Sequence, residues 1–381
     1  MKREIKILRA GELIREVAVV VGTRPGIVMF APIIHALRNQ QVPHFVIHSG
    51  QHYSPNMDAQ FFEDLELPQP QYRLRGVSDR KTHGAQTAVM LEGIEAILME
   101  RKPRLVLVGG DANTNLAGAL AARKLQIAVA HVEAGERSYD WRMPEEHNRR
   151  IIDHISDFLF VTGQKASDNL KAEGVQGEVH IMGNPIVDAS LQHKDLANKK
   201  SKILEKLGLA PHEYAILTSH REENVDHKDR LRDSLKGVSL AASATGLPVV
   251  FFAHPRTQKR LREFGLEQWL KSQPNLTMQD AVGYLDFINL LCNSRLVFTD
   301  SGGVQQEACI HRIPCVTLRE NTEWVETLEI GANVLAGNAP ETIKEAAVKA
   351  MGTWPGKWQI PFGDGNTGEN IAIFVKSYFS S

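Results

Sequence analysis

The chain has 381 residues and a formal net charge of -1 at pH 7. This length favours two domains, and the near-zero charge argues against a surface that binds nucleic acid or anionic membranes. No apolar stretch is long enough to span a membrane, the first sixteen residues lack a secretory core, and the three cysteines lack C-x-x-C spacing, so we expect a cytoplasmic protein without a metal site.

Short apolar runs alternate with helical patterns along the chain. The first series of expected strands comprises Val17–Val21, Phe45–Ile47, Leu105–Val108, Ala128–Val132, Phe158–Val161 and His180–Met182. The second series comprises Ala215–Thr218, Val249–Phe252, Leu296–Thr299 and Cys315–Thr317. Continuous apolar runs separated by helices are typical of parallel sheets. The sequence therefore predicts an α/β protein with two Rossmann-like, doubly wound parallel-sheet domains.

The two series meet at Gly183-Asn184-Pro185, where glycine and proline suit a hinge. We therefore assign residues 1–184 to the N-terminal domain and residues 185–366 to the C-terminal domain. The lysine-rich segment Gln192–Lys206 predicts an exposed helix. Because open α/β sheets bind ligands beyond the carboxyl ends of their strands, we expect the site in a cleft between the domains.

The first candidate anion site follows the first expected strand. Gly22-Thr23-Arg24-Pro25-Gly26 leads into a helical pattern over Ile27–Leu37, and Arg24 offers a planar, fixed charge for phosphate oxygens. The segment has no G-x-G-x-x-G, which argues against a dinucleotide fingerprint. A surface arginine in an ordinary loop between strand and helix explains the same residues equally well.

The second candidate anion site follows Leu296–Thr299. The segment Asp300-Ser301-Gly302-Gly303 predicts a sharp turn into a helix, whose free N–H groups and dipole favour a phosphate. Glu307, one turn further on, would offer a carboxylate for a sugar diol. The alternative is a tight turn with Ser301 as a helix N-cap.

Carboxylates follow two neighbouring expected strands of the first series, and another lies at the start of the helix after them. Asp111 follows Leu105–Val108, Glu133 follows Ala128–Val132, and Glu145 follows a proline at a helix start. Carboxylates crowded in a closed site have pKa values that are pushed apart, so one suits a base and another an acid. Each also has a structural reading, as a turn, a helix cap or a partner of the helix dipole.

Basic residues end two strands of the second series. His220 follows Ala215–Thr218 and could move a proton or bind a phosphate, and His254 follows Val249–Phe252. Both also fit ordinary loop positions. The sequence has no nucleophile elbow and no H-E-x-x-H, which argues against serine hydrolase and zinc peptidase chemistry.

Seven motifs in register over more than 300 residues resemble the UDP-N-acetylglucosamine 2-epimerases. The motifs are Gly22-Thr23-Arg24-Pro25, Gly50-Gln51-His52, Gly110-Asp111, His131-Val132-Glu133-Ala134-Gly135, Met143-Pro144-Glu145-Glu146-x-Asn148-Arg149, His220-Arg221-x-x-Asn224 and Asp300-Ser301-Gly302-Gly303-x-Gln305-x-Glu307. The resemblance implies a GT-B fold, a last helix within residues 367–381 that packs back on the first domain, a UDP-sugar substrate, no cofactor and a homodimer.

The resemblance also implies a reaction and roles for single residues. UDP would leave C1 as C2 loses its proton, giving a 2-acetamidoglucal, and would add back with a proton on the opposite face. The implied acid–base groups are Asp111, Glu133 and Glu145. The implied groups for the diphosphate are Arg24, His220, Ser301, Gly302 and Gly303. Glu307 would bind the ribose, backbone near Phe287 would face the uracil, and Arg149 and His254 would add substrate contacts.

The chain departs from the family pattern at several positions. The family usually has lysine at Met29, and methionine cannot carry that charge, so we expect weaker phosphate binding or turnover unless another cation substitutes. Members often have glutamate at Gly26, arginine at Glu222 and Arg-Pro at Trp324-Val325. These departures leave the sugar and any allosteric activation by the substrate undecided.

Several functions share these motifs. The leading one is a non-hydrolysing epimerase that interconverts UDP-N-acetylglucosamine and UDP-N-acetylmannosamine. The alternatives are a hydrolysing epimerase that releases N-acetylmannosamine and UDP, and an epimerase of a modified UDP-sugar such as a diacetamido uronate. A GT-B glycosyltransferase and a non-catalytic UDP-sugar-binding protein are the other classes; the retained carboxylates argue against both.

Overall fold

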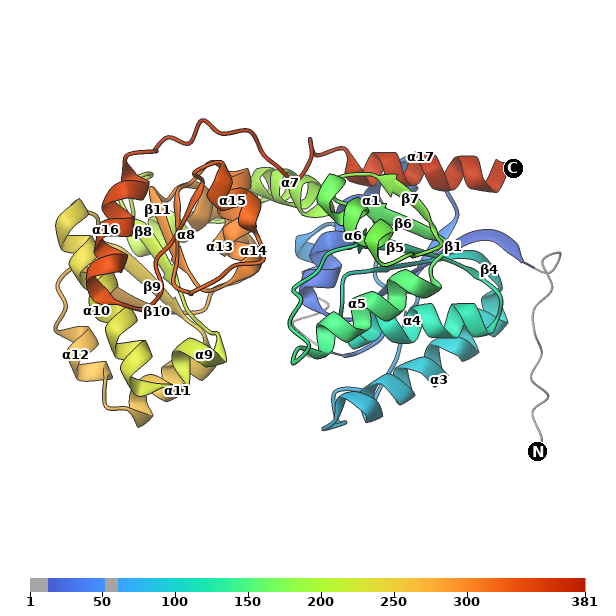
Figure 1. Cartoon of the computed structure of the whole chain (residues 1–381), viewed down its shortest axis with the longest axis horizontal. Coiled ribbons are helices and arrows are strands. Elements are labelled where there is room, and N and C mark those ends of the chain that lie inside the picture. Colours follow the sequence, from blue (N-terminus) through green and yellow to red (C-terminus); the bar gives the residue numbers. More distant parts are fainter. Residues whose placement is uncertain (1–12, 52–60, 381) are drawn as a thin grey trace. The chain divides into compact units, whose positions relative to one another are not determined.

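The computed structural model describes residues 13–51 and 61–380. His52 of the Gly50-Gln51-His52 motif and most of the expected N-terminal extension lie outside the described residues. Contacts divide the chain into unit 1, Met1–Ala189 with Phe362–Ser381, and unit 2, Ser190–Pro361 (Figure 1). No helix in the part of the chain that the structure describes is long and apolar enough to cross a membrane.

Unit 1 contains a seven-stranded sheet in the order β3-β2-β1-β4-β5-β6-β7, with every neighbouring pair parallel. Its strands are β1 (Ile14–Val21), β2 (His44–His48), β3 (Tyr72–Arg73), β4 (Pro103–Gly109), β5 (Ala128–Ala134), β6 (Phe158–Val161) and β7 (Glu178–Ile181). Its helices are α1 (Arg24–Asn39), α3 (His83–Arg101), α4 (Asn113–Lys124), α5 (Pro144–Ile155), α6 (Gln164–Ala172) and α17 (Thr367–Ser380). Helix α7 (Pro185–Lys200) begins in unit 1 and continues in unit 2.

Unit 2 contains a six-stranded parallel sheet in the order β10-β9-β8-β11-β12-β13. Its strands are β8 (Ala215–Thr218), β9 (Val249–Ala253), β10 (Leu276–Asp280), β11 (Leu296–Thr299), β12 (Cys315–Thr317) and β13 (Asn333–Leu335). Its other helices are α8 (Ile203–Leu207), α9 (Glu222–Val225), α10 (Lys228–Thr245), α11 (Pro255–Glu263), α12 (Glu267–Lys271), α13 (Tyr284–Cys292), α14 (Gly302–Ile310), α15 (Val325–Glu329) and α16 (Pro340–Met351).

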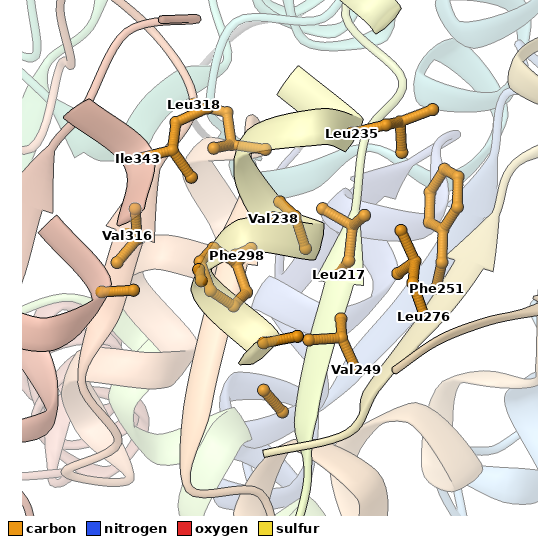
Figure 2. Close-up of a cluster of buried hydrophobic side chains, with 14 of the residues drawn as sticks. Leu217, Leu235, Val238, Val249, Phe251, Leu276, Phe298, Val316, Leu318 and Ile343 are labelled. Atoms are coloured by element: carbon orange, nitrogen blue, oxygen red, sulfur yellow. The ribbon is translucent and has the colours of Figure 1, made fainter. Parts of the chain in front are cut away.

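The core of unit 2 shows why its strands are continuous apolar runs. Leu235 and Val238 of α10 pack with Leu217 of β8 and Phe298 of β11 in one buried cluster (Figure 2). A second buried cluster, which includes Ile216 of β8, belongs to the same unit. Successive side chains of a strand point to opposite faces, so a sheet covered on both faces needs apolar residues at every position.

The predicted α/β class is confirmed, and every predicted strand is present with bounds shifted by at most a few residues. Three short strands were missed, β3, β10 and β13, and each lies at an edge of its sheet. The helix expected over Gln192–Lys206 is two helices, because α7 ends at Lys200 and α8 begins at Ile203.

Helix α17 belongs to unit 1, where it packs on α1 and β6 (Figure 1). The Phe374 ring of α17 makes an edge contact with the Phe158 ring of β6, with centroids 5.1 Å apart. Gly368 allows a close approach to α1, because a Cβ atom at that position would lie 2.8 Å from the carbonyl oxygen of Pro32.

The strand order places the candidate residues at the two reversal points of the sheets. In unit 1 the order reverses between β1 and β4, which are followed by Arg24 and Asp111; in unit 2 it reverses between β8 and β11, which are followed by His220 and Ser301. The loops beyond such a pair of strands diverge to opposite faces of the sheet and leave room for a ligand.

Candidate active site

In unit 1, the turn after β1 is a capped helix start. The Thr23 hydroxyl accepts a hydrogen bond from the Gly26 backbone N–H at 3.2 Å, and Pro25 stands within the first turn of α1, where a missing N–H costs nothing. Arg24 is therefore the first residue of α1 and is exposed. Met29 follows little more than one turn later on the same helix and is half-buried.

Glu133 occupies a bulge at the end of β5. The pairing of β5 with β6 shifts between Val132 and Ala134, and Glu133 between them has a φ of 66°. A bulge redirects the side chain that it contains, and a positive φ is unfavourable for glutamate. Such backbone strain is concentrated at functional sites, so the bulge supports Glu133 as a candidate functional residue.

Asp111 is held by helix α5. The Arg149 guanidinium hydrogen-bonds the Asp111 carboxylate, and Asn148 donates its side-chain N–H to the Asp111 backbone carbonyl at 2.8 Å. The same Arg149 also pairs with Glu146 at 3.0 Å. Both the backbone and the carboxylate of Asp111 are thus fixed by neighbours on one helix, and its negative charge is compensated.

Glu145 and Glu146 differ completely in their surroundings. Glu146 is fully buried, and it accepts hydrogen bonds from the backbone and hydroxyl of Ser138 and forms ion pairs with Arg149 and Arg150. Glu145 is half-buried, and among the described residues it has no hydrogen-bond or ion-pair partner. Glu146 is structural, whereas Glu145 is available for a ligand.

Alternating charges connect Glu146 to the interior of unit 1. Arg150 bridges Glu146 and Glu173, which also binds Arg137, and Arg137 pairs with the fully buried Asp153 at 2.8 Å. Buried charges are tolerated when they are paired and hydrogen-bonded in this way.

Asp153, the innermost carboxylate of this network, contacts the loop that carries Asp111 through His131. The buried His131 ring lies 2.7 Å from Asp153 through Nδ1 and 3.0 Å from the Gly110 carbonyl through Nε2. Asp153 also accepts the Gly135 backbone N–H at 3.2 Å. One buried carboxylate thereby positions the loops after both β4 and β5.

Glu133 and Asp111 have opposite electrostatic environments. Desolvation raises the pKa of Glu133 to about 8, and the negative charges of Glu136 and Asp111 act in the same direction. The charge of Arg149 and the Asn184 amide lower this pKa by smaller amounts. At neutral pH Glu133 is mainly a carboxylic acid, while Asp111 faces a guanidinium, so the pair combines a proton donor with a carboxylate.

In unit 2, Asp300 organises the loop that carries His220. The fully buried Asp300 carboxylate accepts hydrogen bonds from the Ser219 hydroxyl at 2.8 Å, from the backbone N–H groups of His220 and Arg221, and from the Asn224 amide. Burial alone would raise the pKa of Asp300, but the hydrogen bonds and the charge of His220 lower it below its ordinary value. This ionised aspartate fixes the His220 loop beside the start of α14.

The two candidate histidines of unit 2, His220 and His254, lie near each other. The rings of His220 and His254 have centroids 6.2 Å apart, and both side chains reach solvent. His254 is the N-cap of α11, where its Nδ1 accepts the Arg256 backbone N–H. Burial, and then the charges of His220 and Arg256, lower the pKa of His254. His254 is thus a hydrogen-bonding group near the His220 imidazole.

The two glycines of α14 serve different purposes. A Cβ atom on Gly302 would lie 2.1 Å from the Glu323 carboxylate and 3.0 Å from the Trp324 indole nitrogen, so the absence of a side chain at Gly302 lets the Glu323 carboxylate lie close to the start of α14. A Cβ atom on Gly303 would meet nothing within 4 Å, so the backbone there is open to a ligand. Ser301 is the N-cap but makes no side-chain cap hydrogen bond, which leaves its hydroxyl for another acceptor.

Glu307 lies one turn into α14 and is buried. Burial raises the pKa of Glu307 to about 7, and the Tyr284 hydroxyl, which donates to it at 3.3 Å, partly offsets this effect. His193 approaches the same hydroxyl at 3.1 Å. Phe287, on α13 with Tyr284, packs half-buried against the neighbouring apolar cluster. These contacts fix the Glu307 carboxyl in one orientation.

The structure therefore brings Asp111, Glu133 and Arg149 together in unit 1, and His220, His254 and Ser301 follow parallel strands of unit 2. Glu145 has no hydrogen-bond or ion-pair partner among the described residues, so no such contact joins it to Asp111 or Glu133. In the described ranges, 13–51 and 61–380, no group of three or more His, Cys, Asp or Glu residues could hold a metal ion.

Sequence reasoning assigned no role to several residues that build the site. These residues are His131, Glu146, Asp153, Tyr284 and Asp300. All of them except Tyr284 and Asp153 stand inside the quoted motifs, so their place in a motif was the signal that could have identified them. The groups with which they pair depend on the fold and cannot be read from the motifs.

Comparisons with known proteins extend over nearly the whole chain. Residues 35–376 match the family model described as UDP-N-acetylglucosamine 2-epimerase. A protein of Methanocaldococcus jannaschii named UDP-N-acetylglucosamine 2-epimerase is 46% identical over 93% of this chain and 97% of its own length. A Pseudomonas aeruginosa protein named UDP-2,3-diacetamido-2,3-dideoxy-D-glucuronate 2-epimerase is 39% identical over 94% of this chain and 99% of its own.

A solved structure gives the same result for the fold. The crystal structure of the M. jannaschii UDP-GlcNAc 2-epimerase in complex with UDP-GlcNAc and UDP has a TM-score of 0.84 at 45% identity, and the match covers 95% of this chain and 99% of that one. The similarity confirms the predicted GT-B fold class. The chain belongs to the UDP-N-acetylglucosamine 2-epimerase family.

Proposed function

We propose that this chain is an isomerase that interconverts UDP-N-acetylglucosamine and UDP-N-acetylmannosamine without net hydrolysis. Family membership and the names of the relatives support this function. The observation that carries the proposal is the pair Asp111 and Glu133 at the ends of neighbouring strands, one ion-paired and the other neutral. Inversion at a carbon needs one group to remove a proton and another to return it on the opposite face.

The chemistry explains why both phosphate binding and acid–base groups are required. The C2 hydrogen has no adjacent carbonyl, so its direct removal is unfavourable. If the C1–O bond breaks as the proton leaves, the electrons of the C2–H bond form a C1=C2 double bond and UDP departs with the C1–O electrons. UDP then adds back to C1 while C2 accepts a proton.

Unit 2 supplies the groups that we assign to the nucleotide. The open backbone at Gly303 and the hydroxyl of Ser301 suit the diphosphate at the start of α14, with His220 as a further donor. Gly302 permits the close packing of this turn. Glu307 suits the ribose diol, and the backbone at Phe287 suits the uracil. His254 would support His220.

In unit 1 the assignments follow from the partners of each group. Asp111 and Glu133 would act on C2, and the ion pair with Arg149 would hold the Asp111 side chain in position. Glu145, which has no partner among the described residues, would act as a third acid–base or sugar-binding group. The exposed Arg24 would offer charge to the departing diphosphate.

The direct test is to incubate the purified chain with UDP-N-acetylglucosamine and to follow the products by proton and phosphorus NMR. We expect UDP-N-acetylmannosamine to appear until equilibrium, with only trace free UDP. Free UDP that accumulates in proportion to free N-acetylmannosamine would reject the non-hydrolysing function in favour of the hydrolysing one.

A second candidate substrate is a UDP-diacetamido uronate. The P. aeruginosa relative, at 39% identity, carries the name of such an epimerase. The same NMR assay with both sugars in parallel distinguishes the two, because the preferred substrate has the larger kcat/KM.

The Glu307→Ala variant is expected to bind UDP about 10–100-fold more weakly, because it loses the hydrogen bonds between the buried Glu307 carboxyl group and the ribose hydroxyls. Isothermal titration calorimetry measures the change, and Glu345→Ala, on the exposed face of α16, is the control with unchanged affinity. Normal UDP affinity in Glu307→Ala would remove Glu307 from the ribose site.

We also propose that the chain acts as a homodimer, on the basis of the family resemblance. Light scattering of the purified chain should give twice the mass of 42.4 kDa; a single-chain mass at working concentration would reject this assembly.

A further inference from the structure

The side chain of Met29 and the carboxyl group of Glu133 share one corner of unit 1. A Cβ atom on Gly109 would lie 2.9 Å from Met29 Sδ, and a Cβ atom on Gly110 would lie 3.6 Å from Met29 Cε and 3.5 Å from Glu133 Oε2. The thioether of Met29 therefore covers the backbone that leads to Asp111, and it lies near the Glu133 carboxyl, since both groups approach Gly110. An apolar group at this place excludes water and carries no charge.

The charged groups around Glu133 come from three elements. Glu136 follows β5, Asp111 follows β4, and Arg149 lies on α5; the uncharged Asn184 amide precedes α7. The positive charge of Arg149 is already shared between the Asp111 and Glu146 carboxylates. Glu133 is thus surrounded by two anions, an amide and one guanidinium that also pairs with Asp111 and Glu146, and the Met29 thioether lies near it beside Gly110.

We propose that Met29 holds Glu133 in its neutral, proton-donating form, so that Glu133 returns the proton to C2 after Asp111 has removed one from the opposite face. This inference rests on the proposed epimerase function and assigns a separate task to each carboxylate. Burial and the neighbouring anions raise the pKa of Glu133, in agreement with the geometry.

The proton transfers balance within one turnover. Asp111 takes the C2 proton as the C1–O bond breaks and the double bond forms. The Glu133 carboxyl then gives its proton to C2 on the other face as a UDP oxygen re-forms the C1–O bond. Asp111 ends protonated and Glu133 ionised, which is the form that catalyses the reverse direction; exchange with water restores the first form.

A charge placed at Met29 tests the proposal. In Met29→Lys, an ammonium beside Glu133 favours the carboxylate, so the pKa of Glu133 falls. We expect the epimerisation rate of the native chain to decline above about pH 8, which is the basic limb of its pH–rate profile. In Met29→Lys we expect this basic limb to lie about one pH unit or more lower. Met29→Leu, which keeps an apolar side chain of similar volume, should keep the limb in place.

A basic limb at the same pH in Met29→Lys and in the native chain would overturn the proposal. Absence of any C2 chemistry in the native chain would instead reject the epimerase function. The two failures are therefore distinguishable.

A measurement without substrate tests the same claim. The pKa of Glu133 is about 8 in the folded chain and 4.5 without its surroundings. Because the folded value is the higher one, ionisation of Glu133 opposes folding: the penalty is absent below pH 4.5, grows through about pH 8 and is constant above it. Glu133→Gln should therefore raise Tm relative to the native chain at pH 9, with little difference at pH 4.5.

The double variant completes this test. In the Met29→Lys background, Glu133→Gln should raise Tm at pH 9 by much less than in the native background, because lysine stabilises the carboxylate. An equal increase in both backgrounds would contradict the role of Met29.

Discussion

The Asp111→Asn variant is expected to lose exchange of the C2 hydrogen by 10²–10⁴-fold, the usual contribution of a general base. Asparagine keeps the size of the side chain and a hydrogen-bond acceptor for Arg149, but it cannot take a proton. Arg149 also keeps its second partner, Glu146, so the local structure should persist. UDP affinity should stay within about twofold, because all the nucleotide groups that we assign except Arg24 lie in unit 2, and the substitution does not alter Arg24.

The measurements for Asp111→Asn are proton NMR of exchange in heavy water and calorimetry of UDP binding. Asp168→Asn is the matched control, since Asp168 is an exposed aspartate of α6 in the same unit and touches none of the proposed groups. Exchange at the native rate in Asp111→Asn would exclude Asp111 as the base, and lost UDP affinity would indicate structural damage.

The Asp153→Ala variant is expected to lower the free energy of unfolding of unit 1 by about 3–5 kcal/mol. Asp153 is fully buried, and it accepts hydrogen bonds from Arg137 and Gly135 and pairs with His131. Its removal leaves the buried Arg137 charge with one partner fewer and the Nδ1 atom of the buried His131 ring without its partner. Such a loss is a large fraction of the stability of a typical domain.

Urea unfolding followed by circular dichroism measures the effect of Asp153→Ala. The control is Asp229→Ala, which removes an exposed ion pair with Arg232 and should leave the transition midpoint almost unchanged. Equal midpoints for the two variants would show that the buried network contributes little to unit 1.

The interior of the fold could be predicted from sequence because buried parallel strands are continuous runs of apolar residues. Val17–Val21 and Leu296–Phe298 are covered on both faces, so every position in these two segments is apolar. The missed strands lie at sheet edges, where one neighbour is absent and polar residues are tolerated: β3 is Tyr72–Arg73, and β10 contains Thr277, Gln279 and Asp280.

The site could be predicted in part, because strand ends and motif spacing locate polar residues without giving their partners. The motif Glu145-Glu146 offers two identical side chains. Only the contact of Glu146 with Ser138, and its pairing with Arg150 one turn further along α5, separate the buried glutamate from the available one. Similarly, the bulge that redirects Glu133 depends on the register of β5 with β6, which no local pattern encodes.

The adjacent glycines of α14 also show that a sequence motif does not give the contacts of its residues. The sequence predicts one flexible anion-binding turn at Gly302-Gly303, yet Gly302 is buried against the Glu323 side chain, and of the two glycines only Gly303 faces open space. Contacts between segments far apart in the chain decide such roles.

The most direct test of the account is incubation of the purified chain with UDP-N-acetylglucosamine in heavy water, followed by proton NMR and mass spectrometry. We predict one solvent deuterium at C2 of the UDP-N-acetylmannosamine formed, and progressive C2 labelling of the remaining substrate. Epimer that forms with its original hydrogen at C2, or a sugar that is transferred while C2 stays unlabelled, would contradict it.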